Sequence, residues 1–94
     1  MDPREPRRSA YARGYTKKWD RFAKWFRLTY PLCGMRPGGV VPVMSQCYVE
    51  ERDTPATQTD HVVPHRGDQQ LFWNLTNLQS LCAACGARKS QAGL

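Results

Sequence analysis

The sequence predicts a small α+β domain with an N-terminal helix, two short strands and a C-terminal helix. Three observations lead to this fold class: aromatic residues at helical spacing between residues 16 and 30, two short strand-like runs after residue 55, and helix-forming residues near the end of the chain. The 94 residues fit a single domain, 1–94. A domain this small buries little apolar surface, so a structural metal or disulfides would stabilise it considerably.

The first helix is predicted over residues 16–30. Spacings of three and four residues place its aromatic side chains on one face, which favours core packing over base stacking. Thr16 suits the N-cap, and Pro31 suits the end of the helix. The aromatic residues are Tyr15, Trp19, Phe22, Phe26 and Tyr30.

The rest of the chain alternates loops with short elements. Residues 33–55 are rich in glycine and proline and predict loops, with one extended piece around 40–44. A strand over 56–63 should end at Pro64, and a second strand is expected over 77–81. The connection between them holds a turn at 65–68 and an apolar anchor at 71–73. The last helix is predicted over 82–92.

Positive charge is concentrated at the N-terminus. Residues 1–27 hold nine basic and three acidic side chains, whereas residues 28–94 hold five of each. We expect 1–14 to be a flexible basic arm that, with the basic face of the first helix, binds a polyanion such as nucleic acid. A solubilising tail is the alternative. The predicted nucleic-acid contacts are Arg13, Lys17, Lys18, Arg21, Lys24, Arg66, Arg88 and Lys89.

The sequence also bears on location. It holds no apolar run of 18 residues, so no transmembrane helix and no membrane partner are expected. The N-terminal residues lack the apolar stretch of a secretory signal, and a cytoplasmic protein is therefore expected. In that compartment, cysteines are more often metal ligands than disulfide partners.

Four cysteines are candidate ligands of one structural Zn²⁺: Cys33, Cys47, Cys82 and Cys85. Cys82-Ala83-Ala84-Cys85 is a CxxC pair, which lets two thiolates reach one tetrahedral ion from a tight turn. Such an ion would fasten the long loop after the first helix to the start of the last helix. Two disulfides or free buried thiols are the alternatives.

Asp60-His61, inside the first predicted strand, could supply hydrolytic chemistry. Cleaving a phosphodiester near neutral pH needs a base that activates water and a cation that takes up developing charge. An imidazole can act as that base, and a carboxylate can hold a hard cation. Neighbours in a strand point to opposite faces, so the two side chains can act without competing for space.

In its wider context this dipeptide resembles the HNH endonucleases of tailed phages and prophages. The resemblance extends from about residue 15 to residue 89, and motif, cysteine framework and order of elements agree. The matching motifs are Pro31-Leu32-Cys33, Asp60-His61-Val62-Val63-Pro64-His65, Asp68, Leu71-Phe72-Trp73-Asn74, Thr76-Asn77-Leu78-Gln79-Ser80-Leu81-Cys82-Ala83-Ala84-Cys85 and Arg88-Lys89.

The resemblance implies a ββα-metal (HNH or His-Me finger) core over 56–92, a hairpin and a helix holding one divalent cation, braced by the four-cysteine zinc. By similarity, His61 is the general base, Asp60 is a cation ligand, and Asn77 holds the catalytic loop in position. The cation would be Mg²⁺ or Mn²⁺, with Zn²⁺ or Ni²⁺ as alternatives. DNA, bound largely without sequence specificity, would be cut to leave a 3′-hydroxyl and a 5′-phosphate. A phage or prophage origin, a bacterial host cytoplasm and phage packaging partners follow by analogy only.

One position departs from the family pattern. Gly86 stands where the resemblance implies a histidine that binds the cation, and glycine has no donor atom. We therefore expect impaired activity, with His65 as a conceivable substitute ligand. An engineered inactive variant, a decayed copy and rewired metal binding all remain open. So do two other functions: a catalytically inactive, zinc-stapled DNA-binding module, and a zinc-ribbon-like protein-interaction domain.

Overall fold

The computed structural model describes residues 16–38 and 44–93. Its elements follow the order α1 (Lys17–Thr29), α2 (Gln46–Val49), β1 (Gln58–His61), α3 (Gln69–Trp73), η1 (Leu75–Asn77), β2 (Leu78–Leu81) and α4 (Ala83–Gln91). The predicted arm over 1–14 and nearly all of the predicted extended piece over 40–44 lie outside the described residues. The predicted small α+β fold is confirmed.

Helix α1 begins and ends close to the predicted residues. The Thr16 side chain accepts a hydrogen bond from the Trp19 backbone N–H, as an N-cap does. At the other end, the Tyr30 N–H donates to the Phe26 carbonyl, and Pro31 follows without an N–H of its own. The capping residues that the sequence offered therefore delimit this helix.

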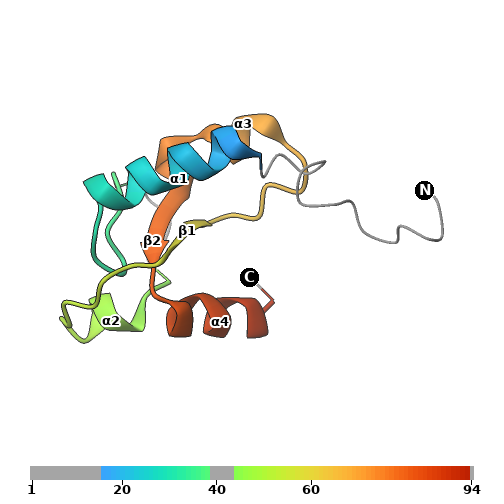
Figure 1. Cartoon of the computed structure of the whole chain (residues 1–94). Coiled ribbons are helices and arrows are strands. Elements are labelled where there is room, and N and C mark those ends of the chain that lie inside the picture. Colours follow the sequence, from blue (N-terminus) through green and yellow to red (C-terminus); the bar gives the residue numbers. More distant parts are fainter. Residues whose placement is uncertain (1–15, 39–43, 94) are drawn as a thin grey trace.

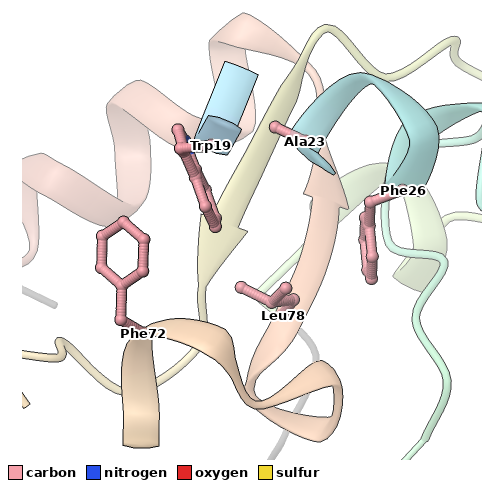
Figure 2. Packing of buried hydrophobic residues seen from close by; sticks show 5 residues of the cluster. All are labelled: Trp19, Ala23, Phe26, Phe72 and Leu78. Atoms are coloured by element: carbon pink, nitrogen blue, oxygen red, sulfur yellow. The ribbon is translucent and has the colours of Figure 1, made fainter. Parts of the chain in front are cut away.

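The aromatic face of α1 forms the main hydrophobic core, as predicted. Trp19, Ala23 and Phe26 of α1 pack with Phe72 of α3 and Leu78 of β2 (Figure 2). Phe26, Phe72 and Leu78 are fully buried. Other aromatic side chains, partly buried, pack against this cluster: Phe22, Tyr30 and Trp73.

Strands β1 and β2 form a two-stranded antiparallel hairpin in which Asp60 pairs with Gln79 and His61 pairs with Leu78. Figure 1 shows α1 and α3 on one side of this hairpin and α2 and α4 on the other. Because side chains alternate along a strand, successive residues of β1 face these two different sides.

The loop after α1 runs along the other edge of β2. The Gly34 N–H donates to the Ser80 carbonyl, and the Ser80 N–H donates to the Met35 carbonyl. Gly34 has a φ of 95°, and a Cβ there would overlap with the Tyr48 Cβ. Glycine is therefore required where this loop passes α2.

Two short helices were not predicted. Helix α2 is a single turn of four residues with Ser45 as its N-cap. Helix α3 has five residues, and its N-cap Asp68 accepts hydrogen bonds from the Gln70 and Leu71 N–H groups. Helices of four and five residues are little longer than one helical turn, so an argument from periodicity, which needs several turns, misses them. The predicted strand over 56–63 is also shortened to Gln58–His61.

Candidate active site and cysteine cluster

The four cysteines come together where the loop after α1, helix α2 and the start of α4 meet. Their Sγ atoms all lie within 4.8 Å of one another, and the Cys47 Sγ lies 3.8 Å from Cys82 Sγ and 3.9 Å from Cys85 Sγ. A tetrahedral zinc with Zn–S bonds of about 2.3 Å separates its sulfurs by about 3.8 Å. All four thiols are buried and unpaired as disulfides. The distances among the four sulfurs therefore fit a structural zinc and do not fit disulfide bonds.

The surroundings of the cluster shift its thiol pKa values in opposite directions. Burial raises the pKa of the Cys33 thiol to about 12, although a hydrogen bond with Ser45 acts in the opposite direction. Burial also raises the pKa of Cys85, but hydrogen bonds from the Cys47 backbone and the neighbouring thiols outweigh it and lower this pKa to about 6. Thiols packed this closely compete for one negative charge, and a bound cation would remove that competition.

His61 lies at the end of β1 with its ring in the aromatic core. The side chain is 7% exposed and stacks on the Trp19 indole, with centroids 5.1 Å apart and an interplanar angle of 17°. Its Nε2 lies 2.9 Å from the Phe72 carbonyl oxygen. A carbonyl can only accept, so Nε2 carries the proton and Nδ1 carries the lone pair of the neutral ring.

The same burial keeps this ring neutral. Burial lowers the pKa of His61 below its usual value of 6.5. The hydrogen bond to Phe72 and the Asp60 carboxylate act in the opposite direction, while His65 and Lys89 add to the lowering. At neutral pH His61 is therefore an uncharged imidazole that can accept a proton.

Asn77 ties together the segment that follows His61. Its Oδ1 accepts from the Val63 N–H at 2.9 Å, and its Nδ2 donates to the Val63 and Leu71 carbonyls at 3.0 and 3.2 Å. Its own carbonyl accepts from the Val62 N–H at 2.8 Å. These contacts link η1, directly before β2, to the segment after β1 and to α3, which is the geometry expected of a positioning residue.

Asp60 faces the opposite side of the hairpin, toward α4. Its Oδ2 accepts a hydrogen bond from Gln79 Nε2 at 3.2 Å and lies 3.4 Å from Lys89 Nζ. The Asp60 side chain is 25% exposed, whereas that of Lys89 is only 6% exposed. The Asp60 side chain is thus partly buried and held from two sides.

Gly86 lies in α4 directly against β1. A Cβ at this position would overlap with Oε1 of Gln58 and lie 3.0 Å from its Cδ. Sequence reasoning passed over Gln79, which contacts Asp60, and Gln58, which lies against Gly86 and shares the Asp60 face of β1. Gln58 precedes Asp60 by two residues in a strand, and this spacing was the signal that could have identified it.

His65, the conceivable substitute ligand, lies on the other side of the hairpin. Its ring packs against His61 and Phe72, with centroids 4.8 and 4.7 Å away. Its Nδ1 accepts a hydrogen bond from the Gly67 N–H at 3.0 Å. His65 thus contacts the predicted base rather than the polar site around Asp60.

The predicted nucleic-acid contacts are distributed unevenly. Those on α1 are exposed, and the Lys18 ammonium lies over the Trp73 ring, 5.1 Å from its centroid. Arg66 and Arg88 are exposed near the two sides of the hairpin, and Arg13 lies outside the described residues. Lys89 differs from the expectation of a surface phosphate contact, because its side chain is buried and paired with Asp60. The α1 residues are Lys17, Lys18, Arg21 and Lys24.

Among solved structures, the chain resembles the HNH endonuclease of the deep-sea thermophilic bacteriophage GVE2, crystallised with manganese ion. The match has a TM-score of 0.65 and 28% sequence identity, and it covers 89% of this chain and 80% of that one. This chain has the HNH nuclease fold. No protein-family model and no curated protein matches it.

The match confirms the resemblance to HNH endonucleases and the architecture inferred with it. The manganese of the phage enzyme belongs to that structure, and the cysteine cluster of this chain suggests a structural zinc. Over residues 16–38 and 44–93, no helix is both long and apolar enough to cross a membrane.

Proposed function

We propose that this protein is a metal-dependent HNH endonuclease that hydrolyses phosphodiester bonds in DNA. The observation that carries the proposal is the state of His61: a neutral ring, oriented by the Phe72 carbonyl, beside a carboxylate on the other face of the same strand. Together with the HNH nuclease fold, this pairing supplies a base and an anionic cation ligand at one strand end.

In this mechanism, Nδ1 of His61 takes a proton from a water molecule that attacks the phosphorus. The Nε2–H bond to the Phe72 carbonyl fixes the tautomer, and that carbonyl also stabilises the positive charge that the ring gains. The Trp19 indole limits rotation of the ring. Proton transfer of this kind contributes about 10²–10⁴-fold to a rate.

Asp60 provides the anionic ligand on the other side of the hairpin, held by Gln79. A divalent cation bound there would stabilise the charge that builds on the phosphate and on the leaving oxygen. Asn77 acts as a positioning residue, because its contacts with Val63 and Leu71 fix the connection that carries the Phe72 carbonyl. The products would be a 3′-hydroxyl and a 5′-phosphate.

The DNA would be held mainly through its phosphates. The exposed cations of α1, with the basic segment before them, supply charge without base-reading geometry, so binding should be largely independent of sequence. A role in the cytoplasm of a bacterial host, near phage genome packaging, is consistent with the phage homologue but rests on analogy.

A catalytically inactive DNA-binding module on the same fold is the second candidate. It is favoured by Gly86, which offers no ligand, and by Lys89, whose ammonium already neutralises the Asp60 carboxylate. Neither feature weakens the cysteine cluster or the exposed cations of α1. DNA binding would therefore survive even if cleavage were lost.

A plasmid-nicking assay across Mg²⁺, Mn²⁺, Zn²⁺ and Ni²⁺ distinguishes the two candidates. We expect slow, cation-dependent nicking that is strongest with Mn²⁺ and is abolished by His61→Ala. Gln70→Ala, which removes an exposed side chain from the same connection, is the control and should keep most of the activity. Retained DNA binding without nicking under any cation would establish the inactive module instead.

A further inference from the structure

We propose that Gln58 takes the place of the missing histidine, so that its carboxamide oxygen and the Asp60 carboxylate form an all-oxygen cation site between β1 and α4. This inference deepens the proposed nuclease function and rests on it. In this site, an amide oxygen from β1 takes the place of an imidazole from α4.

Gln58 fills the space next to the Cα of residue 86. The Gln58 carboxamide lies where any side chain at residue 86 would have to begin, because a Cβ there would overlap with Gln58 Oε1. A histidine at this position and the observed Gln58 conformation therefore exclude one another. Because residue 86 is glycine, Gln58 can occupy the space from which a histidine at residue 86 would have bound the cation.

The alternation of side chains along β1 places both oxygen donors on one face of the strand. Gln58 and Asp60 are two residues apart in β1, so their side chains share the face that meets α4. The contacts agree: Gln58 lies against Gly86, and Asp60 lies beside Lys89, one helical turn farther along α4. Two oxygen donors therefore project from one strand toward one face of one helix.

The Asp60 carboxylate is supported by Gln79 of β2. Gln79 pairs with Asp60 across the hairpin, is fully buried, and donates from Nε2 to Asp60 Oδ2. Its Oε1 accepts from the Met44 N–H at 3.4 Å, which fixes the orientation of the amide. Asp60 is thus held in place, while the exposed Gln58 can adjust to a cation that enters from solvent.

The donor set determines which cation the site prefers. Carboxylate, amide carbonyl and water suit Mg²⁺, Mn²⁺ and Ca²⁺, whereas imidazole suits Zn²⁺ and Ni²⁺. Exchanging a nitrogen ligand for an amide oxygen should weaken binding of every transition metal, and binding of Zn²⁺ and Ni²⁺ most. The chain should therefore be a more selective Mg²⁺ or Mn²⁺ protein than a version with histidine at this position.

Mn²⁺ binding tests this directly, measured by electron paramagnetic resonance on zinc-loaded protein without DNA. We expect Gln58→Leu to weaken Mn²⁺ binding at least about tenfold, Gln58→Glu to strengthen it, and Asp60→Asn to abolish it. Gln91→Leu, at the exposed end of α4, is the matched control and should leave binding unchanged. Gly86→His should raise the affinity for Ni²⁺ more than that for Mn²⁺.

The inference would be wrong if Gln58→Leu bound Mn²⁺ as tightly as the native protein while Asp60→Asn did not bind it. Because cleavage is not the readout, the two proposals can fail separately. Mn²⁺ binding that depends on Gln58 without any DNA nicking would retain the cation site and reject the nuclease. Nicking that is unaffected by Gln58→Leu would retain the nuclease and reject this ligand.

Discussion

The cysteine cluster and the polar site around Asp60, the two candidate metal sites of this molecule, differ in how closed they are. The cysteine cluster is buried, and its four sulfurs lie within 4.8 Å of one another, close enough to bind one ion. The polar site around Asp60 is partly exposed and combines a carboxylate, two amides and an ammonium, with no side chain at Gly86. One site has a complete ligand set, and the other has a changed one.

The difference follows from what each site must do. A structural zinc has no vacant position, and loss of one of its four ligands leaves a buried gap that water cannot fill without cost. A catalytic cation keeps positions for water and substrate, so a lost side chain can be replaced by water or by a neighbouring oxygen. We therefore expect a ligand change to be tolerated at residue 86 and not at Cys85.

The largest effect should come from the cysteine cluster. Cys85→Ser or a strong chelator should abolish the cooperative unfolding transition, because structural zinc sites contribute about 10–16 kcal/mol, more than the whole stability of most small domains. Thermal melting followed by circular dichroism, with zinc analysis, measures this. Ala84→Ser, an exposed neighbour, is the control. A chelated protein that melts like the native one would show that zinc does not hold the fold.

Gly86→His should have the next largest effect, on cleavage rather than on folding. Gln58 can swing away from the new side chain because only the far end of its flexible side chain is in the way. The restored nitrogen ligand should raise plasmid nicking by about 100-fold or more, through better stabilisation of developing charge. DNA affinity should change little.

Gly86→Ala is the matched control for that substitution, since it displaces Gln58 without adding a donor. It should lower nicking while raising helix stability by up to about 1 kcal/mol. Adding His61→Ala to the histidine variant should remove the activity again. Efficient nicking by the native chain, unchanged by histidine, would mean that residue 86 is not a ligand position.

A smaller effect is expected at Lys89, whose ammonium lies 3.4 Å from Asp60 Oδ2. A cation that binds Asp60 must compete with this charge, so Lys89→Met should raise Mn²⁺ affinity by about tenfold, equivalent to about 1.4 kcal/mol. Arg88→Met, exposed on the same helix, is the control. If Mn²⁺ affinity fell instead, Lys89 would be supporting the site rather than competing for it.

The smallest effect concerns the protonation of His61. Its pKa is lowered by burial, so the neutral base should predominate at pH 7, and nicking should fall as the pH drops through a midpoint below 6.5. The His61 ring resonances, followed by NMR in zinc-loaded protein without added cation, give that midpoint, and His61→Ala provides the assignment. A midpoint above 6.5 would place His61 in a more open environment than the aromatic core.

The sequence predicted more of the cysteine cluster than of the site around Asp60. Cys33 and Cys47 could be grouped with the CxxC pair because four cysteines in a chain expected to be cytoplasmic are the usual ligand set of one structural zinc. Asp60 and His61 were found through a motif, and Gly86 through its departure from that motif. The contact of Gln58 with Gly86 and the buried position of Lys89 could not be found this way, because both depend on how α4 packs against β1.

The sequence alone determined the elements whose causes are local. Helix α1 follows from aromatic spacing, an N-cap threonine and a terminal proline, and the alternation of side chains in a strand separates Asp60 from His61. Only the tertiary structure decided which groups meet across the hairpin. The His61 tautomer depends on a carbonyl from α3, and the environment of Asp60 depends on α4. These contacts join residues 11 to 29 positions apart, and no local pattern encodes the distance between two packed surfaces.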